Sequence, residues 1–170
     1  MRSLCIIALL GVVIACRTPT PKAKDGGPPL KCTIEARDTY FLDDRVVVLF
    51  LLENRVERDL HVLQWRNPLE GVREKIFRVW RSGGELGYRG PKIYRGKPTR
   101  ASYETIEAGK TVITKVDLAA HYRFERRGSY SLEFTGGILD HAWGDAVRVA
   151  RPADFRRLPL SCNSVNFQMR

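Results

Sequence analysis

The sequence predicts an all-β domain, an antiparallel β-sandwich of about seven to nine strands. Short runs rich in β-branched and aromatic residues recur between turn residues, and no segment of useful length has the 3.6-residue apolar period of a helix. Because no helices alternate with the strands, a parallel α/β sheet is excluded. We assign residues 31–170 to this domain, an ordinary size for a single unit.

The first half of the domain carries its most apolar strand. Residues 45–54 form a dense β-branched and aromatic run, typical of a central strand with both faces buried. The polar run 53–59 then predicts a hairpin loop to the alternating segment 59–65. Asn67-Pro68 ends that segment, because proline cannot donate to a ladder and restrains its predecessor.

The sequence around this corner is "LQWRNPLEG", residues 63–71. Trp65 falls on the same face of the strand as two neighbouring side chains, which indicates packing rather than catalysis. We interpret Trp65 as core support, and Arg66 and Glu70 as charges that fix the loop.

The other predicted elements follow the same period-2 reasoning. Residues 89–98 hold two glycines and two prolines and are expected to be irregular, and so is the stretch 136–159. The remaining strands are expected within residues 31–37, 75–81, 85–88, 102–118, 128–134 and 163–169, with turns at 82–84 and 108–110.

The strand at residues 128–134 narrows the fold class. It places Tyr130, Leu132 and Phe134 inward, directly after a glycine turn. An inward tyrosine there resembles the tyrosine corner of immunoglobulin-like sandwiches. We therefore expect an immunoglobulin-like sandwich.

The amino terminus is a separate export signal. Met1-Arg2 is a short positive start, and "SLCIIALLGVVIA" is apolar but too short for a stable transmembrane helix. The run ends in "VIAC", which resembles a bacterial lipobox, so residues 1–15 are predicted to be a signal peptide and Cys16 the lipidated first residue. An ordinary secretory signal with a chance cysteine is the alternative.

A lipid anchor would hold the protein to a membrane without a spanning helix. Residues 16–30 are rich in Pro, Gly, Thr and Lys and are predicted to be the lipidated cysteine and a flexible tether. Arg17, rather than aspartate, follows the cysteine, which favours the outer membrane if the cell is Gram-negative.

The net charge is +10, and loss of the signal removes only Arg2. The cations are spread along the chain, and no groove-reading helix or RNA-binding aromatic motif occurs, so we expect no nucleic-acid partner. An anionic envelope surface suits diffuse positive charge better.

Of the four cysteines, Cys5 leaves with the signal and Cys16 takes the lipid. An exported compartment permits disulfides, so Cys32 and Cys162 are predicted to pair. Two free buried thiols are the alternative.

Catalytic patterns are lacking in the sequence. His61 and His121 lie in strand or linker patterns, and no His-Glu-x-x-His, Gly-x-Ser-x-Gly or phosphate-binding glycine motif occurs. Asp140, His141 and Asp145 are the weak candidates for metal ligands; a polar loop around its tryptophan is the favoured interpretation. We therefore expect no enzyme activity and no cofactor.

Several motifs in their order resemble one known module. "LQWRNPLEG" is followed by a glycine hairpin, a Tyr-x-x-Ile-x-Ala-Gly segment, Asp-Leu-x-x-x-Tyr and Gly-x-Tyr-x-Leu-x-Phe, at residues 63–71, 84–90, 103–112, 117–122 and 128–134. This order is similar to the β-rich accessory domain of bacterial deuterolysin-like and peptidyl-Lys metalloendopeptidases, the aspzincin peptidases. It spans residues 33–134, with a weaker echo at "SCNSVNF".

The resemblance implies a fold and an exported context. The peptidase's ligand histidines, glutamate and aspartate have no counterpart in this sequence. We therefore predict a non-catalytic, membrane-anchored envelope lipoprotein with an immunoglobulin-like interaction sandwich. The alternative is a stand-alone inhibitor or chaperone of a separate aspzincin peptidase, which would then be its protein partner.

Overall fold

The chain folds as an all-β protein in the computed structural model, which describes residues 21–23 and 26–170. Within that part the helices are single 3₁₀ turns, and none is long and apolar enough to cross a membrane. The strands are β1 (Leu30–Glu35), β2 (Thr39–Tyr40), β3 (Val47–Asn54), β4 (Leu60–Leu63), β5 (Phe77–Arg81), β6 (Gly84–Glu85), β7 (Tyr103–Ile106), β8 (Thr111–Asp117), β9 (Gly128–Phe134), β10 (His141–Trp143) and β11 (Val165–Met169). The helical turns are η1 (Pro68–Glu70), η2 (Arg100–Ser102), η3 (Leu118–Ala120) and η4 (Pro152–Asp154).

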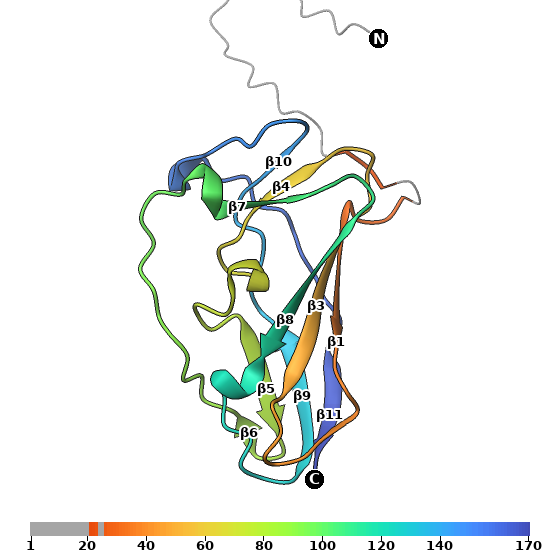
Figure 1. The fold of residues 1–170 in the computed structure, drawn as a ribbon, viewed down its shortest axis with the longest axis vertical. Coiled ribbons are helices and arrows are strands. Elements are labelled where there is room, and N and C mark those ends of the chain that lie inside the picture. Colours follow the sequence, from red (N-terminus) through yellow and green to blue (C-terminus); the bar gives the residue numbers. More distant parts are fainter. Residues whose placement is uncertain (1–20, 24–25) are drawn as a thin grey trace, which may run out of the picture.

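The strands form three sheets (Figure 1). The β3 sheet has the order β1-β3-β8, the β9 sheet has the order β2-β11-β9-β5-β6, and the β4 sheet has the order β10-β4-β7. All pairings are antiparallel except that of β2 with β11, which is parallel. The described strands thus outnumber the predicted seven to nine, because the short strands β2 and β10 lie where no strand was expected, β10 within the stretch 136–159 that was expected to be irregular.

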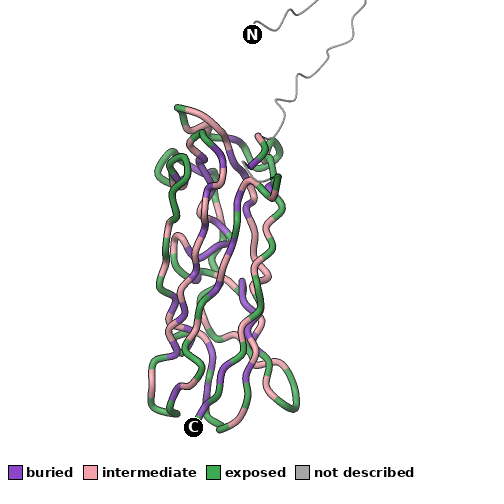
Figure 2. The backbone as a smooth tube through the Cα atoms, turned by 90° about the vertical axis from the view of Figure 1, so that its right-hand side faces the viewer, coloured by how far each residue is buried: buried purple, intermediate pink, exposed green. Residues whose placement is uncertain are grey.

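The main core lies between the β3 and β9 sheets. Burial alternates along β3, where Phe50 points inward and its ring lies 5.0 Å from that of Phe134 on β9. Phe77 of β5 adds an edge contact to Phe134 at 5.6 Å. Figure 2 shows the same alternation of buried and less buried positions along the chain. Burial of such aromatic rings removes a large apolar area from water and is the main stabilising term.

The prediction that β3 is buried on both faces is wrong. Leu49 and Leu51, on the face away from the core, are only half-buried. Ile113 of β8, which lies opposite Leu51, is 57% exposed, so this face of the sheet meets solvent. An uninterrupted apolar run does not distinguish a strand that is buried on both faces from a strand that is buried on one face and carries large apolar side chains on the other.

The predicted hairpin between β3 and β4 is also wrong, because the two strands belong to different sheets. The buried amide of Asn54 fixes the crossing: its Nδ2 donates to the carbonyl oxygens of Arg58, Ile106 and Glu107 at 2.8, 2.9 and 3.1 Å. The turn between β7 and β8 crosses between the same two sheets. A buried amide without these acceptors would be costly, so Asn54 defines where the chain leaves one sheet for the other.

Tyrosine hydroxyl groups hold the loops at the opposite end of the molecule. The Tyr130 hydroxyl donates to the Arg126 carbonyl at 2.7 Å. Tyr122 donates to the Phe77 carbonyl at 2.6 Å. Each bond satisfies a buried polar tip while its ring packs in the core.

The predicted disulfide between Cys32 and Cys162 is present, with the two Cα atoms 4.7 Å apart. It joins β1 of the β3 sheet to the segment that enters β11 of the β9 sheet. The side chain of Asn163 repeats the connection, because it accepts from Ile34 N at 2.8 Å and donates to Ile34 O at 2.9 Å. A covalent bond and two hydrogen bonds therefore hold the two sheets together at this edge.

Part of the predicted tether lies against the domain. Ala23 is buried, and its carbonyl accepts from Gly26 N at 3.1 Å. The Pro29 carbonyl accepts from Arg55 N at 2.9 Å. The predicted signal peptide and Cys16 lie outside the described residues.

Replacing both Cys32 and Cys162 by serine should lower the free energy of unfolding by about 4 kcal/mol, because the bridge closes a loop over a sequence separation of 130. Denaturant unfolding of the variant and the oxidised parent measures the difference. A loss below about 1 kcal/mol would show that the Asn163 hydrogen bonds and the core hold the sheets without the bridge.

Candidate interaction surface

The corner at residues 63–71 is a packed turn. The buried Asn67 side chain donates to the Leu63 carbonyl at 2.9 Å and accepts from Leu69 N at 3.1 Å, which caps η1. Trp65 is only 8% exposed. The predictions of a supporting tryptophan and an Asn-Pro turn are therefore confirmed.

An ion pair then joins this corner to a distant segment. The two terminal guanidinium nitrogens of Arg95, Nη1 and Nη2, donate to the two carboxylate oxygens of Glu70, the bond from Nη1 at 2.7 Å. The Arg95 guanidinium also lies 5.1 Å from the centre of the Trp65 ring. Both charged side chains are mostly buried, so this two-point pair is shielded from water and fixed in direction. We call these three residues the clamp.

Of the two charged residues that were expected to fix the loop, Arg66 and Glu70, only Glu70 forms a shielded ion pair. Glu70 fixes the loop through the clamp. Arg66 lies 4.0 Å from Glu74, and both side chains are substantially exposed. Exposed pairs of this kind contribute little to stability.

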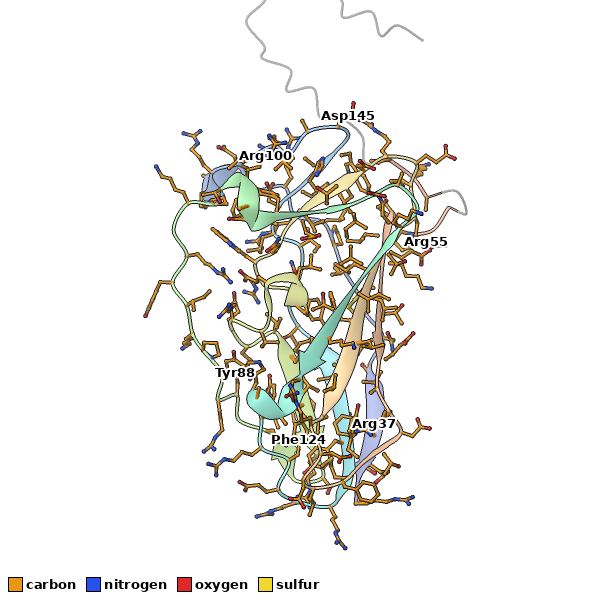
Figure 3. All side chains as sticks on the ribbon, viewed as in Figure 1. Arg37, Arg55, Tyr88, Arg100, Phe124 and Asp145 are labelled. Atoms are coloured by element: carbon orange, nitrogen blue, oxygen red, sulfur yellow. A yellow bond between two sulfur atoms is a disulfide. The ribbon has the colours of Figure 1, made fainter. Side chains whose placement is uncertain are left out.

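The clamp holds residues 89–100, which we call the strap. It runs along one edge of the molecule, outside the sheets, from β6 to η2 (Figure 1). At its start, Arg89 N donates to the His121 carbonyl at 2.8 Å, and the Tyr88 ring stacks on His121 (Figure 3). Gly90 passes so close to these rings that a Cβ atom there would lie 2.5 Å from His121 Nδ1.

The end of the strap is also fixed. Pro98 is buried, and Thr99 and Ser102 form a reciprocal capping box at η2, with Thr99 N donating to Ser102 Oγ at 3.0 Å. With the clamp in between, the strap is attached at three places. Its irregular backbone is therefore held by these separate contacts, mostly of side chains, and not by the ladder of a sheet.

Between these attachments the strap presents large side chains to solvent. Tyr94 is fully exposed and Ile93 is 40% exposed. Lys92 and Lys97 are exposed beside them, and residues 86–100 contain no acidic side chain. This surface was not predicted from the sequence, because the glycines and prolines of the segment indicate only irregular structure. The signal that could have found the surface is a cluster of cations, without an acidic residue, around two apolar residues.

The metal candidates do not form a site. Asp140 is fully buried, and its carboxylate accepts from the Tyr103 hydroxyl at 2.8 Å, from Arg148 at 3.1 Å and from Arg156 N at 2.7 Å. Asp145 is exposed at the end of the molecule (Figure 3). Among the described residues, no three His, Cys, Asp or Glu side chains are grouped as metal ligands would be.

His141 takes part in the same buried network. Its Nδ1 lies 2.7 Å from the Arg156 carbonyl and therefore carries a proton. Burial lowers the pKa of the His141 imidazole below its usual value. The carboxylate and the ring thus tie the irregular segment 140–156 to the β4 sheet.

The other two histidines are structural in the same sense. His61 bridges Thr105 Oγ1 at 2.8 Å and the Gly144 carbonyl at 2.7 Å, which links all three strands of the β4 sheet. Burial lowers the pKa of His121, whose ring packs on Tyr88. Both positions agree with the interpretation as packed side chains.

Asp140→Asn should lower the free energy of unfolding by about 3 kcal/mol, because it leaves Arg148 without its buried counter-charge. Asp145→Asn is the matched control and should change stability by less than about 0.5 kcal/mol, since this side chain is exposed. Thermal or denaturant unfolding compares the two. Equal effects, or a rise in the melting temperature of the parent on adding Zn²⁺, would contradict the structural role of Asp140.

Comparison with models of protein families and with curated proteins finds no match for this chain.

Proposed function

We propose that the protein is a non-catalytic, lipid-anchored envelope protein whose β-domain is an immunoglobulin-like interaction module, and that the strap is its contact surface. The observation that carries the proposal is the fully exposed Tyr94 between exposed cations, on a segment that the clamp holds in place. Aromatic side chains are enriched at recognition surfaces relative to the rest of a protein surface. Exposure on a fixed backbone also lowers the entropy lost on binding.

Three features support an immunoglobulin-like sandwich. The β3 and β9 sheets face each other across the shared aromatic core. A short strand, β2, pairs in parallel with the last strand, β11, at the edge of the β9 sheet. The Tyr130 hydroxyl bonds back to the carbonyl of Arg126, two residues before β9 begins, as a tyrosine corner does. The resemblance to the aspzincin accessory domain suggests the same architecture.

The anchor proposal rests on the lipobox-like "VIAC" after a short apolar run. If Cys16 carries the lipid, the chain from Cys16 to the buried Ala23 spans at most about 25 Å even when fully extended. The domain would thus be held close to the bilayer, with the outer membrane as the proposed location in a Gram-negative cell. We prefer this function to a peptidase inhibitor or chaperone, because the strap offers a cationic surface with exposed apolar side chains.

Cys16→Ser should release the protein from the membrane fraction of the bacterial host, because the thiol is the proposed attachment point. The measurement is fractionation with an antibody, together with mass spectrometry of the amino-terminal peptide of the parent. Cys5→Ala, which keeps the apolar run of the predicted signal peptide and leaves the disulfide intact, serves as the control for loss of a cysteine elsewhere. An unmodified Cys16 in the parent would refute the anchor, whatever the strap binds.

A further inference from the structure

We propose that the strap contacts a bilayer surface that carries anionic phospholipid headgroups. This inference deepens the proposed function by naming the partner of the strap. It does not require the lipid on Cys16, since it rests on charge, exposure and fixation of residues 89–100.

The charge of the strap is uncompensated. Some exposed cations of the domain have acidic partners: Arg45 lies 2.8 Å from Asp117, and Lys75 lies 2.6 Å from Glu85. Other exposed cations, such as Lys110 and Lys115, have none among the described residues, and the strap combines such cations with two adjacent exposed apolar side chains. For the exposed Lys92 and Lys97, no acidic side chain in the described part of the chain forms an ion pair. Their charge is therefore available to an anionic partner, and each lysine near an anionic bilayer strengthens binding about fivefold.

The apolar side chains of the strap favour a bilayer over a soluble polyanion. Ile93 and Tyr94 are exposed next to each other, with lysines on both sides. A tyrosine ring has an apolar body and a polar tip and prefers the level of the lipid headgroups, while lysine side chains extend toward the phosphates. A polyanion in water would use the lysines and leave Ile93 without a role.

The third argument is the fixed geometry. Arg95 lies between Tyr94 and Lys97 in the sequence, yet its guanidinium turns inward to Glu70 and Trp65. Tyr94 beside it is fully exposed. The strap that carries both residues runs outside the sheets (Figure 1). Ile93 and Tyr94 are therefore already exposed on a fixed backbone in the free protein, so binding requires little ordering of the strap.

The test measures binding of the full chain carrying Cys16→Ser, so that no acyl group contributes. Sedimentation is measured with phosphatidylcholine vesicles, with and without phosphatidylglycerol. The neutral vesicles report any contribution of the apolar amino terminus, and the gain from phosphatidylglycerol reports the charged contact. We expect this gain to fall steeply as salt is raised.

Two variants probe the strap. Lys92→Gln with Lys97→Gln should lower the phosphatidylglycerol-dependent partition coefficient about twentyfold. Tyr94→Ser should lower it severalfold without changing net charge. Lys110→Gln with Lys115→Gln is the control, because both side chains are exposed outside the strap and the charge change is the same. This pair should lower the coefficient by less than about threefold.

Each other outcome overturns the proposal. Equal losses in the two lysine pairs would mean that only diffuse net charge acts. Retained binding in Tyr94→Ser, or heparin binding with the same dependence on Tyr94, would point to a soluble polyanion instead of a bilayer. Mass spectrometry detects lipid on Cys16 independently of vesicle binding. A failure of the proposed bilayer contact of the strap can therefore be distinguished from a failure of the proposed lipid anchor.

Discussion

Between its two fixed ends, the middle of the strap depends on one interaction, the paired hydrogen bonds of Arg95 to Glu70 above the ring of Trp65. The strap has no ladder partner, so without a side-chain attachment each of its residues would regain about 1–2 kcal/mol of conformational entropy. The pair is strong because burial shields it and because its two-point geometry leaves one orientation. Asn67 makes this possible: it fixes the corner that places Trp65 and Glu70 on the same side.

Much of the fold could be predicted from the alternation of apolar and polar residues and from the positions of glycine and proline. The disulfide, the inward Tyr130 and the strands near residues 75–81 and 128–134 were predictable because local pattern and compartment determine them. Strand partners were not: β3 and β4 are separated by a polar loop that looks like a hairpin. Only the buried acceptors around Asn54 direct the chain into a different sheet. A one-dimensional pattern does not contain those tertiary hydrogen bonds.

The functional residues show the same limit. Asp140, His141 and Asp145 are close in sequence, but Asp140 turns into the interior toward Tyr103 while Asp145 stays exposed. Proximity in sequence therefore suggested a cluster that the fold separates. Arg95 and Glu70 are far apart in sequence, and their pairing brings the strap to the corner. The sequence gives the number of cations but not the direction of their side chains, so it indicated diffuse positive charge. In the fold, the Arg95 side chain turns inward and the neighbouring lysines Lys92 and Lys97 stay exposed.

The most direct test of this account is backbone ¹⁵N relaxation of residues 91–97 in the parent and in Arg95→Gln. If the clamp fixes the strap, the parent should give order parameters near the value of about 0.85 found for rigid backbone. In Arg95→Gln they should fall below about 0.6 in the strap alone, while β9 is unchanged. A strap that is already mobile in the parent, or that stays rigid without the Arg95 guanidinium, would contradict the account.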